Sequence, residues 1–187
     1  FHDPKDKNQL SILARHFIGG LLANIKEITA ILNPTVNSYK RLVPGFEAPT
    51  YISWANRNRS ALIRIPTGRE DSTRCELRSP DLSGNPYLQF AVMLAAGIKG
   101  IEDKITPPEP VEKNIYELSE NEKEKHNIRH LPESLGHALS FMDGSDLLKE
   151  TLGNHIFYNF LHVKKSEWGN YRTQVTPWEV DKYLPIL

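Results

Sequence analysis

One stretch of this sequence, residues 33 to 49, constrains the fold most, because it cannot form a single regular helix or strand. Pro34 stands near its start and Pro49 at its end, and each proline fixes its φ angle and lacks a backbone N–H donor. Gly45 supplies a turn between them. The stretch also carries two adjacent cations and one isolated carboxylate, which an interior segment does not need. This composition indicates a loop that closes over an anionic substrate.

The residues ahead of this loop, 11 to 29, predict an amphipathic helix. Apolar side chains recur there with the 3.6-residue period of a helix. They are Leu10, Leu13, Ala14, Phe17, Ile18, Leu21, Leu22, Ile25 and Ile28. The pair Gly19 and Gly20 interrupts the pattern, and each glycine costs about 1 kcal/mol relative to alanine. A close contact with another backbone would offset that cost.

Short strand patterns follow the loop. Residues 51 to 55 and 60 to 65 predict two strands around an Asn-Arg-Asn turn, and residues 73 to 78 predict a third. Alternate side chains of a strand share a face. The face of the third strand that suits a core consists of Thr73, Cys75 and Leu77. The opposite face consists of Arg74, Glu76 and Arg78.

The rest of the chain predicts helices. Asn85 as N-cap and Pro86 at the first helical position begin one helix, whose end Gly97 and Gly100 mark. Further helices are expected at residues 132–142, 145–152 and 154–171, and a capping pattern at 176–179 starts a last one. We therefore predict an α+β fold, in which part of an antiparallel sheet carries the loop and residues 111–187 form a helical C-terminal part.

Composition and charge exclude several classes of partner. The chain has 187 residues, with 23 basic and 23 acidic side chains, so its formal net charge of zero indicates no nucleic-acid partner. No apolar run approaches the roughly 20 residues that span a bilayer, so we expect no membrane partner. The single cysteine, Cys75, fits a reducing cytoplasm. Because the chain begins at Phe1 rather than methionine, we expect it to be a piece of a longer protein.

The charged face of the third strand has two interpretations. It is either a surface salt ladder of little energetic weight or a ligand-binding face. In the second case Glu76 binds a divalent cation, and the flanking arginines bind carboxylate or phosphate oxygens. Arg59 and Arg64 are five positions apart, so both reach one site only if Arg59 lies on the turn or a bulge intervenes. The residues alone leave these alternatives open.

Three blocks of the sequence resemble the glutamine synthetase family in order and spacing. They are residues 33–49, 56–66 and 74–88. The resemblance covers nearly the entire chain but only the C-terminal part of the family's longer subunit, and residues 172–179 resemble the type I branch regulated by feedback inhibition. It implies the C-terminal part of that family's catalytic domain, with residues 33–49 as the active-site flap. The implied activity is ATP-dependent ligation of ammonia to L-glutamate through γ-glutamyl phosphate, with Mg²⁺ or Mn²⁺ as the metal.

The resemblance also implies roles for five arginines. Arg41 and Arg78 bind the substrate glutamate. Arg64 and Arg74 bind ATP. Arg59 binds both substrates and stabilises the transferring phosphoryl group, which suits a reaction catalysed mainly by positioning and charge neutralisation.

Two carboxylates complete the implied site. Glu76 matches a ligand of an active-site divalent metal. Glu47, in the flap, matches the residue that contacts glutamate, attracts ammonium and accepts its proton. The family takes further metal ligands from upstream strands, so we expect this chain alone to be inactive.

The resemblance implies an assembly as well, and it leaves alternatives. The full-length parent is expected to be a double-ring dodecamer, with residues 176–187 as an assembly segment. Tyr116 matches a tyrosine that is adenylylated in another branch, but its acidic flank differs and we expect no such modification. The alternatives are a γ-glutamyl ligase that uses another amine, a non-enzymatic assembly relative, and a phosphate-binding module.

Overall fold

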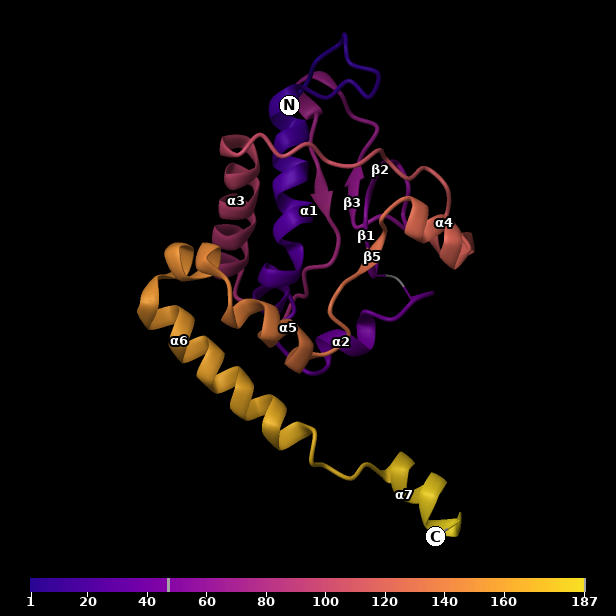
Figure 1. The fold of residues 1–187 in the computed structure, drawn as a ribbon, viewed down its shortest axis with the longest axis vertical. Helices are drawn as coiled ribbons and strands as arrows, with labels where there is room; N and C mark the ends of the chain where they lie inside the picture. Colours follow the sequence, from indigo (N-terminus) through magenta and orange to yellow (C-terminus); the bar gives the residue numbers. More distant parts are fainter. Residues whose placement is uncertain (47, 187) are drawn as a thin grey trace.

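The computed structural model describes residues 1–46 and 48–186 and confirms the α+β class. Figure 1 shows a body of helices and short strands, from which a C-terminal arm extends. The helices are α1 (Ile12–Leu32), α2 (Ser38–Arg41), α3 (Pro86–Glu102), α4 (Glu120–Lys125), α5 (Leu135–Asp143), α6 (Asp146–Tyr171) and α7 (Pro177–Tyr183). The strands are β1 (Tyr51–Ile52), β2 (Trp54–Asn56), β3 (Ile63–Ile65), β4 (Glu76–Leu77) and β5 (Arg129–His130). Short 3₁₀ turns are η1 (Glu70–Ser72), η2 (Ile115–Glu117) and η3 (Leu184–Ile186).

Helices α1 and α3 lie side by side, with α3 at one edge of the body (Figure 1). The prediction for α1 is confirmed, and Ser11 caps it by accepting a hydrogen bond from the Ala14 amide at 3.2 Å. A Cβ atom at Gly20 would lie only 2.2 Å from the carbonyl oxygen of Ala96 in α3. Gly20 is therefore explained by a close approach of the two helix backbones, and a Cβ atom at Gly19 would instead meet the backbone of Ile105, beyond the end of α3.

The predicted end of α3 is wrong. Gly97 and Gly100 were expected to end this helix, but it continues to Glu102. A Cβ atom at Gly100 would lie 2.3 Å from the carbonyl oxygen of His16. Gly100 is thus needed for close packing against α1 rather than for a helix terminus. The predicted start is confirmed, because the Asn85 side chain accepts hydrogen bonds from the first helical amides.

The strands form two small sheets, and one pairing differs from the prediction. The three-stranded sheet has the order β2-β3-β4, and β1 pairs with β5. β3–β4 is antiparallel as expected, and β1–β5 is an antiparallel pair that the sequence did not predict, whereas β2 and β3 run parallel, with Trp54 opposite Ile63. Parallel neighbours normally require a long crossover. Because each of these strands has only three residues, the short connection 57–62 is long enough to bring the chain back to the start of β3, parallel to β2.

The predicted two faces of the third strand are confirmed for its inner side. Cys75 and Leu77 pack against the main hydrophobic core. Burial raises the pKa of the Cys75 thiol to about 11, so this cysteine stays protonated and is not a nucleophile. The regular strand is shorter than predicted, covering Glu76–Leu77 only.

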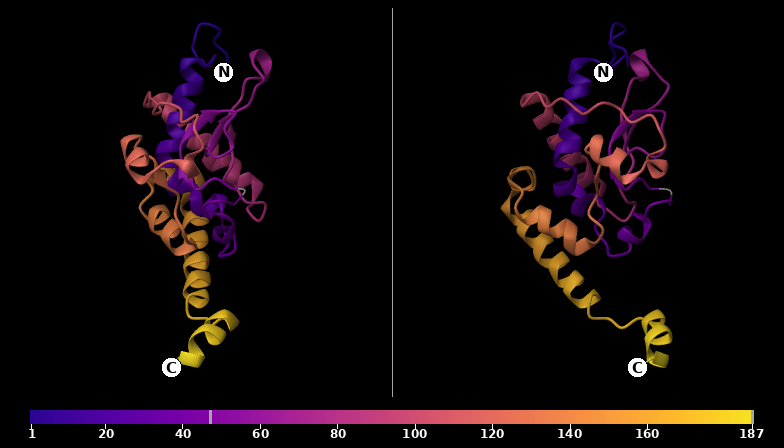
Figure 2. Two further views of the ribbon diagram at one scale, coloured as in Figure 1. Left: turned by 90° about the vertical axis from the view of Figure 1, so that its right-hand side faces the viewer. Right: turned by 45° about the vertical axis from the view of Figure 1, so that its right-hand side comes forward.

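The C-terminal arm begins within α6. Gly153 has a φ of 69° and breaks this helix at the predicted boundary between two helical segments. Beyond it the helix runs out from the body, and α7 lies at its far end in every view (Figures 1 and 2). The predicted cap is confirmed as a capping box between Thr176 and Glu179. None of the helices in the described part of the chain is long and apolar enough to cross a membrane.

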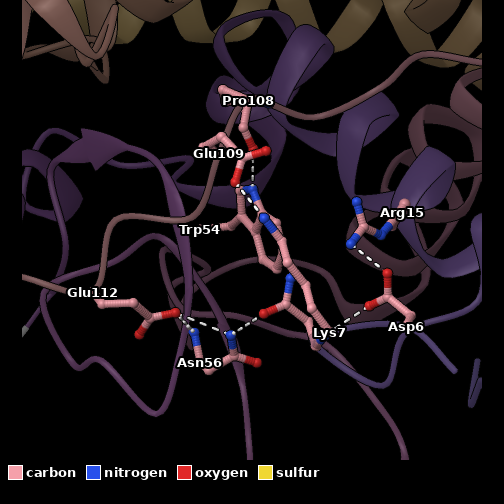
Figure 3. A network of polar contacts seen from close by, with 9 residues as sticks. Asp6, Lys7, Arg15, Trp54, Asn56, Pro108, Glu109 and Glu112 are labelled. Carbon is pink, nitrogen blue, oxygen red and sulfur yellow. Dashed lines mark hydrogen bonds and ion pairs between the residues drawn. The ribbon is translucent and has the colours of Figure 1, made fainter. Parts of the chain in front are cut away.

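Polar contacts fix the N-terminal segment and the proline-rich linker 107–110 beside the sheet (Figure 3). Lys7 forms an ion pair with Glu109 at 2.8 Å, and Trp54 donates from Nε1 to the carbonyl oxygen of Pro108 at 2.6 Å. The side chain of Asn56 donates to Glu112 at 3.0 Å. These contacts place the linker beside β2, ahead of η2 in the sequence.

Candidate functional site

An open cavity of about 750 Å³ collects most of the cationic residues that the sequence singled out. Among the described residues it is lined by Arg41, Phe46, Ala48, Asn58, Arg59, Ser60, Arg64, Arg78, Asn114 and Tyr116. These side chains come from the flap segment (residues 33–49), the β2–β3 connection, β3, the end of β4 and η2. Four arginines and no acidic residue are found among the described lining residues, so the cavity suits an anionic ligand. We call it the arginine cavity.

Arg59 and Arg64 both line the arginine cavity, which the sequence left open. Arg64 lies on β3, whereas Arg59 precedes this strand in the irregular β2–β3 connection. Strand alternation therefore does not force the two side chains apart. Arg59 is exposed at the cavity, where its guanidinium group is accessible to a ligand.

Glu76 is held between two arginines. It lies opposite Arg64 in the antiparallel β3–β4 pair, and Arg64 Nε donates to Glu76 Oε2 at 3.0 Å. Arg74 Nη2 reaches the other carboxylate oxygen at 3.1 Å. Burial alone would raise the pKa of Glu76, but the hydrogen bonds and charges of Arg64 and Arg74 outweigh it and lower this pKa. Arg74 is exposed, and neither it nor Glu76 is among the residues that line the arginine cavity.

Arg78 is fixed by backbone carbonyl groups at the cavity floor. Its amide donates to the carbonyl oxygen of Leu62 at 3.0 Å, and its guanidinium donates to that of Ala61 at 3.3 Å. Burial lowers the pKa of Arg78, and the positive charges of Arg64 and Arg59 lower it further. This crowding of like charges shows that the cavity concentrates positive potential.

Arg41 belongs to the flap segment and is anchored at its base. It lies at the end of α2, a short helix that the sequence did not predict. Its Nη2 atom donates to Asn33 Oδ1 at 3.2 Å and to the carbonyl oxygen of Ser79. Lys40 beside it is exposed, as expected. The proposed ammonium-capturing residue, Glu47, lies outside the described residues.

The described residues do not fit a complete divalent-metal site. No group of three or more histidine, cysteine, aspartate or glutamate side chains clusters within residues 1–46 and 48–186. Glu76 offers one carboxylate, and arginines already contact both of its oxygens. Mg²⁺ and Ca²⁺ take about six or more oxygen ligands.

Sequence reasoning missed the polar frame of the arginine cavity. Asn58 donates from Nδ2 to the carbonyl oxygens of Val111 and Lys113, both at 2.8 Å. Its Oδ1 accepts hydrogen bonds from both the amide and the hydroxyl of Ser60. These bonds fix the β2–β3 connection that carries Arg59. The Asn-Arg-Asn turn was the available signal, but its long-range partners could not be predicted.

Comparisons with known proteins converge. The family model described as glutamine synthetase, catalytic domain, matches residues 1–183. A glutamine synthetase from Methanosarcina mazei is 54% identical over 187 residues, which are 100% of this chain and 42% of that protein. One from Thermus thermophilus is 52% identical over 184 residues, or 98% of this chain and 41% of that protein. This chain thus spans about two fifths of the length of these relatives.

Solved structures agree in fold. A GmaS–ADP complex superimposes with a TM-score of 0.86 at 36% sequence identity, covering 98% of this chain and 42% of that one. GmaS without ligand gives a TM-score of 0.83 at 36% identity, covering 97% and 40%. In both cases the match extends over nearly all of this chain.

Proposed function

The chain belongs to the glutamine synthetase family, and we propose that it supplies the flap and the arginine cavity of an enzyme that ligates ammonia to L-glutamate. ATP first phosphorylates the γ-carboxylate of glutamate, and ammonia then displaces phosphate from γ-glutamyl phosphate. The observation that carries this proposal is the convergence of Arg41, Arg59, Arg64 and Arg78 on one cavity without an acidic neighbour among the described lining residues.

The arginines have different roles in this reaction, because they occupy different positions in the site. Arg41 and Arg78, both fixed by backbone carbonyl groups, bind the carboxylate groups of glutamate. Arg59 is exposed at the same cavity, and it neutralises negative charge on the phosphoryl group as it transfers. Such a contact is stronger in the transition state than in the ground state, so it accelerates the reaction.

Arg64 and Arg74 are assigned to the binding of ATP. Both pair with Glu76, so this carboxylate orients them toward the phosphates of ATP. The similarity to a solved structure that is a GmaS–ADP complex supports nucleotide binding by the enzyme to which this chain belongs. We assign Glu76 as one ligand of a divalent cation, Mg²⁺ or Mn²⁺, whose other ligands come from outside residues 1–187. Glu47 is assigned to ammonium capture at the flap.

The 187-residue chain is proposed to be inactive alone, because one carboxylate cannot hold the metal that such a site requires. A chimera tests the function. Residues 1–187 replace the matching segment of the Methanosarcina mazei glutamine synthetase, and glutamine formation and phosphate release are measured with ammonia. We expect the chimera to make glutamine and the isolated chain to make none.

The same chimera decides between the alternatives. Methylamine in place of ammonia tests a ligase for another amine, and a faster reaction with methylamine would replace our assignment. A folded chimera that neither binds ATP nor releases phosphate would favour the non-enzymatic assembly relative. A chimera that binds phosphate without making any product would favour the phosphate-binding module.

The C-terminal arm is proposed to join subunits in a double ring of a cytoplasmic enzyme. Its last residues expose large apolar side chains, among them Trp178 at 62% and Leu184 at 67%. Aromatic side chains such as that of Trp178 are among the residues that dominate subunit contacts. Deleting residues 176–187 from the chimera should split stacked rings, as measured by sedimentation, and a truncated chimera that still sediments as a double ring would refute this role.

A further inference from the structure

Asn58 uses its whole hydrogen-bonding capacity within the chain. Its Nδ2 atom donates to the carbonyl oxygens of Val111 and Lys113, both at 2.8 Å. Its Oδ1 atom accepts from the amide of Ser60 at 2.9 Å and from the hydroxyl of Ser60 at 2.8 Å. A side-chain amide has two donor hydrogens and an oxygen with two lone pairs. All four are therefore satisfied by the chain itself.

Ser60 extends this network to η2. Its hydroxyl group donates to Asn58 and accepts from the Ile115 amide at 3.0 Å. Ser60 is only 7% exposed and Ile115 is fully buried, so water competes little for these bonds. The network thus joins the β2–β3 connection to residues 111–115 by contacts that span 53 to 55 positions of the sequence.

Arg59 lies between the two connected residues, Asn58 and Ser60. Its backbone is also held from another direction, because the guanidinium group of Arg78 donates to the carbonyl oxygens of Arg59 and Ala61. Its side chain, in contrast, is exposed at the arginine cavity. The backbone around Arg59 is thus fixed, while its guanidinium group is accessible to a ligand.

The four bonds of Asn58 require a short amide side chain. Aspartate has the same shape, but its carboxylate only accepts and would face two carbonyl oxygens. Serine has a single donor hydrogen. Glutamine carries the same amide one methylene group further out, which displaces it from the carbonyl oxygens of Val111 and Lys113. The side chain at position 58 is therefore matched to joining these two segments.

We propose that Asn58 is a positioning residue for phosphoryl transfer. It holds the β2–β3 connection against residues 111–115 and so keeps the Arg59 guanidinium where charge develops on the transferring group. This role rests on the function proposed above, because Arg59 must act on a phosphoryl group. A preorganised charge stabilises a transition state without rearranging, and a misplacement of about 1 Å can cost on the order of 10²-fold in rate. Asn58 thus acts through Arg59 rather than by contact with substrate.

A double-mutant cycle in the chimera tests this coupling. Asn58→Ala should lower kcat about tenfold or more. It should leave the KM for glutamate within about threefold, because Arg41 and Arg78 are retained. In the Arg59→Ala background the same substitution should lower kcat by less than about twofold, because the group that it positions is gone. An unchanged kcat in Asn58→Ala, or two losses that simply multiply, would overturn the proposal.

Asn56→Ala is the matched control for this cycle. Asn56 also bonds the segment that follows the proline-rich linker, since its Nδ2 atom donates to Glu112 at 3.0 Å, but it is not among the described residues that line the arginine cavity. Its substitution should change kcat by less than about twofold in either background. Ser60→Ala removes the hydroxyl that joins Asn58 to Ile115. It should lower kcat in the same way as Asn58→Ala but less, and it serves as the test if Asn58→Ala does not fold.

Amide hydrogen exchange of the chain itself tests the hold on the connection without any ligase activity. In Asn58→Ala the Ile115 amide should exchange about fivefold faster, because the Ser60 hydroxyl loses the partner that orients it. Asn56→Ala should leave this rate unchanged. An unchanged Ile115 rate in Asn58→Ala would overturn the positioning role whatever the chimera catalyses. A chimera without ligase activity would instead overturn the proposed function and, with it, the action of Arg59 on a phosphoryl group.

Discussion

The α1–α3 helix pair and the arginine cavity are held in place by different forces. Between the helices, the backbones approach so closely that a single Cβ atom at Gly20 or Gly100 would overlap a carbonyl oxygen. In the cavity, charged side chains are held by carbonyl groups and by one carboxylate, and the interior is open. The first region is defined by steric fit and the second by electrostatics.

This difference separates stability from function. A packed helix interface loses free energy of unfolding when its volume changes, because interiors are close-packed. In the arginine cavity, burial and then the like charges of Arg64 and Arg59 lower the pKa of Arg78, so we expect this cluster of charges to contribute little to stability. Substitutions in the two regions should therefore affect different measurements, and the following predictions test that separation in the chimera or in the chain itself.

The largest effect is expected from Arg59→Ala. Removing a charge that acts on the transferring phosphoryl group should lower kcat about 10²-fold or more, with little change in unfolding free energy, because the side chain is exposed. Steady-state kinetics of the chimera, with urea unfolding in parallel, measure both. The exposed Arg57 in the same connection offers a matched control, Arg57→Ala. A loss confined to the KM for ATP would contradict the assignment.

The reverse pattern is expected from Gly100→Val. The new side chain would overlap the backbone of α1 at His16, so the free energy of unfolding should fall by about 2 kcal/mol. Gly144→Ala is the control, because nothing lies within 4 Å of a Cβ atom there, and its effect should stay within about 0.5 kcal/mol. Urea unfolding measures both. Equal stability of the two variants would show that α1 and α3 have room to separate.

Local rules predicted much of the helix pair and the arm. Ser11 and Asn85 cap helices because their side chains accept from nearby amides, a property visible within four residues. Gly153 and Thr176 likewise mark a break and a start. The role of Gly100 was mistaken for a terminus, because the reason for a glycine lay on another helix.

The cavity depended on information that no local pattern contains. The parallel pairing of β2 with β3 arises from the path of the connection between them, and this path also lets Arg59 join Arg64. The family resemblance supplied this convergence, whereas strand alternation argued against it. Asn58 and Asn114 escaped notice because their contributions rest on contacts far along the chain.

A smaller effect is expected from Arg41→Ala. This residue is proposed to bind glutamate in ground and transition states alike, so the variant should raise the KM for glutamate roughly tenfold and leave kcat nearly unchanged. Lys40→Ala is the control, because the neighbouring side chain is exposed to solvent. Initial rates at varied glutamate concentration measure both. A fall in kcat without a change in KM would assign Arg41 to the transition state instead.

The smallest effect concerns the carboxylate that links the arginines. The pKa of Glu76 is lowered in the folded state, so its ion pairs stabilise the fold at pH values above its unfolded pKa, about 4.3. This contribution is lost as the pH falls through the lower, folded pKa.

Because Arg74 is 56% exposed, we expect less than about 1 kcal/mol for the pair of contacts at neutral pH. Glu76→Gln should thus be slightly less stable than the natural chain at pH 7. The difference should shrink as the pH falls below about 4.3, because the natural carboxylate becomes protonated through its lower, folded pKa. Urea unfolding at pH 7, 5 and 3 measures this difference, with Glu124→Gln, an exposed carboxylate on α4, as the control. A difference that grew as the pH fell would show that Glu76 is destabilised by its surroundings, and the electrostatic description of its contacts with Arg64 and Arg74 would then be wrong.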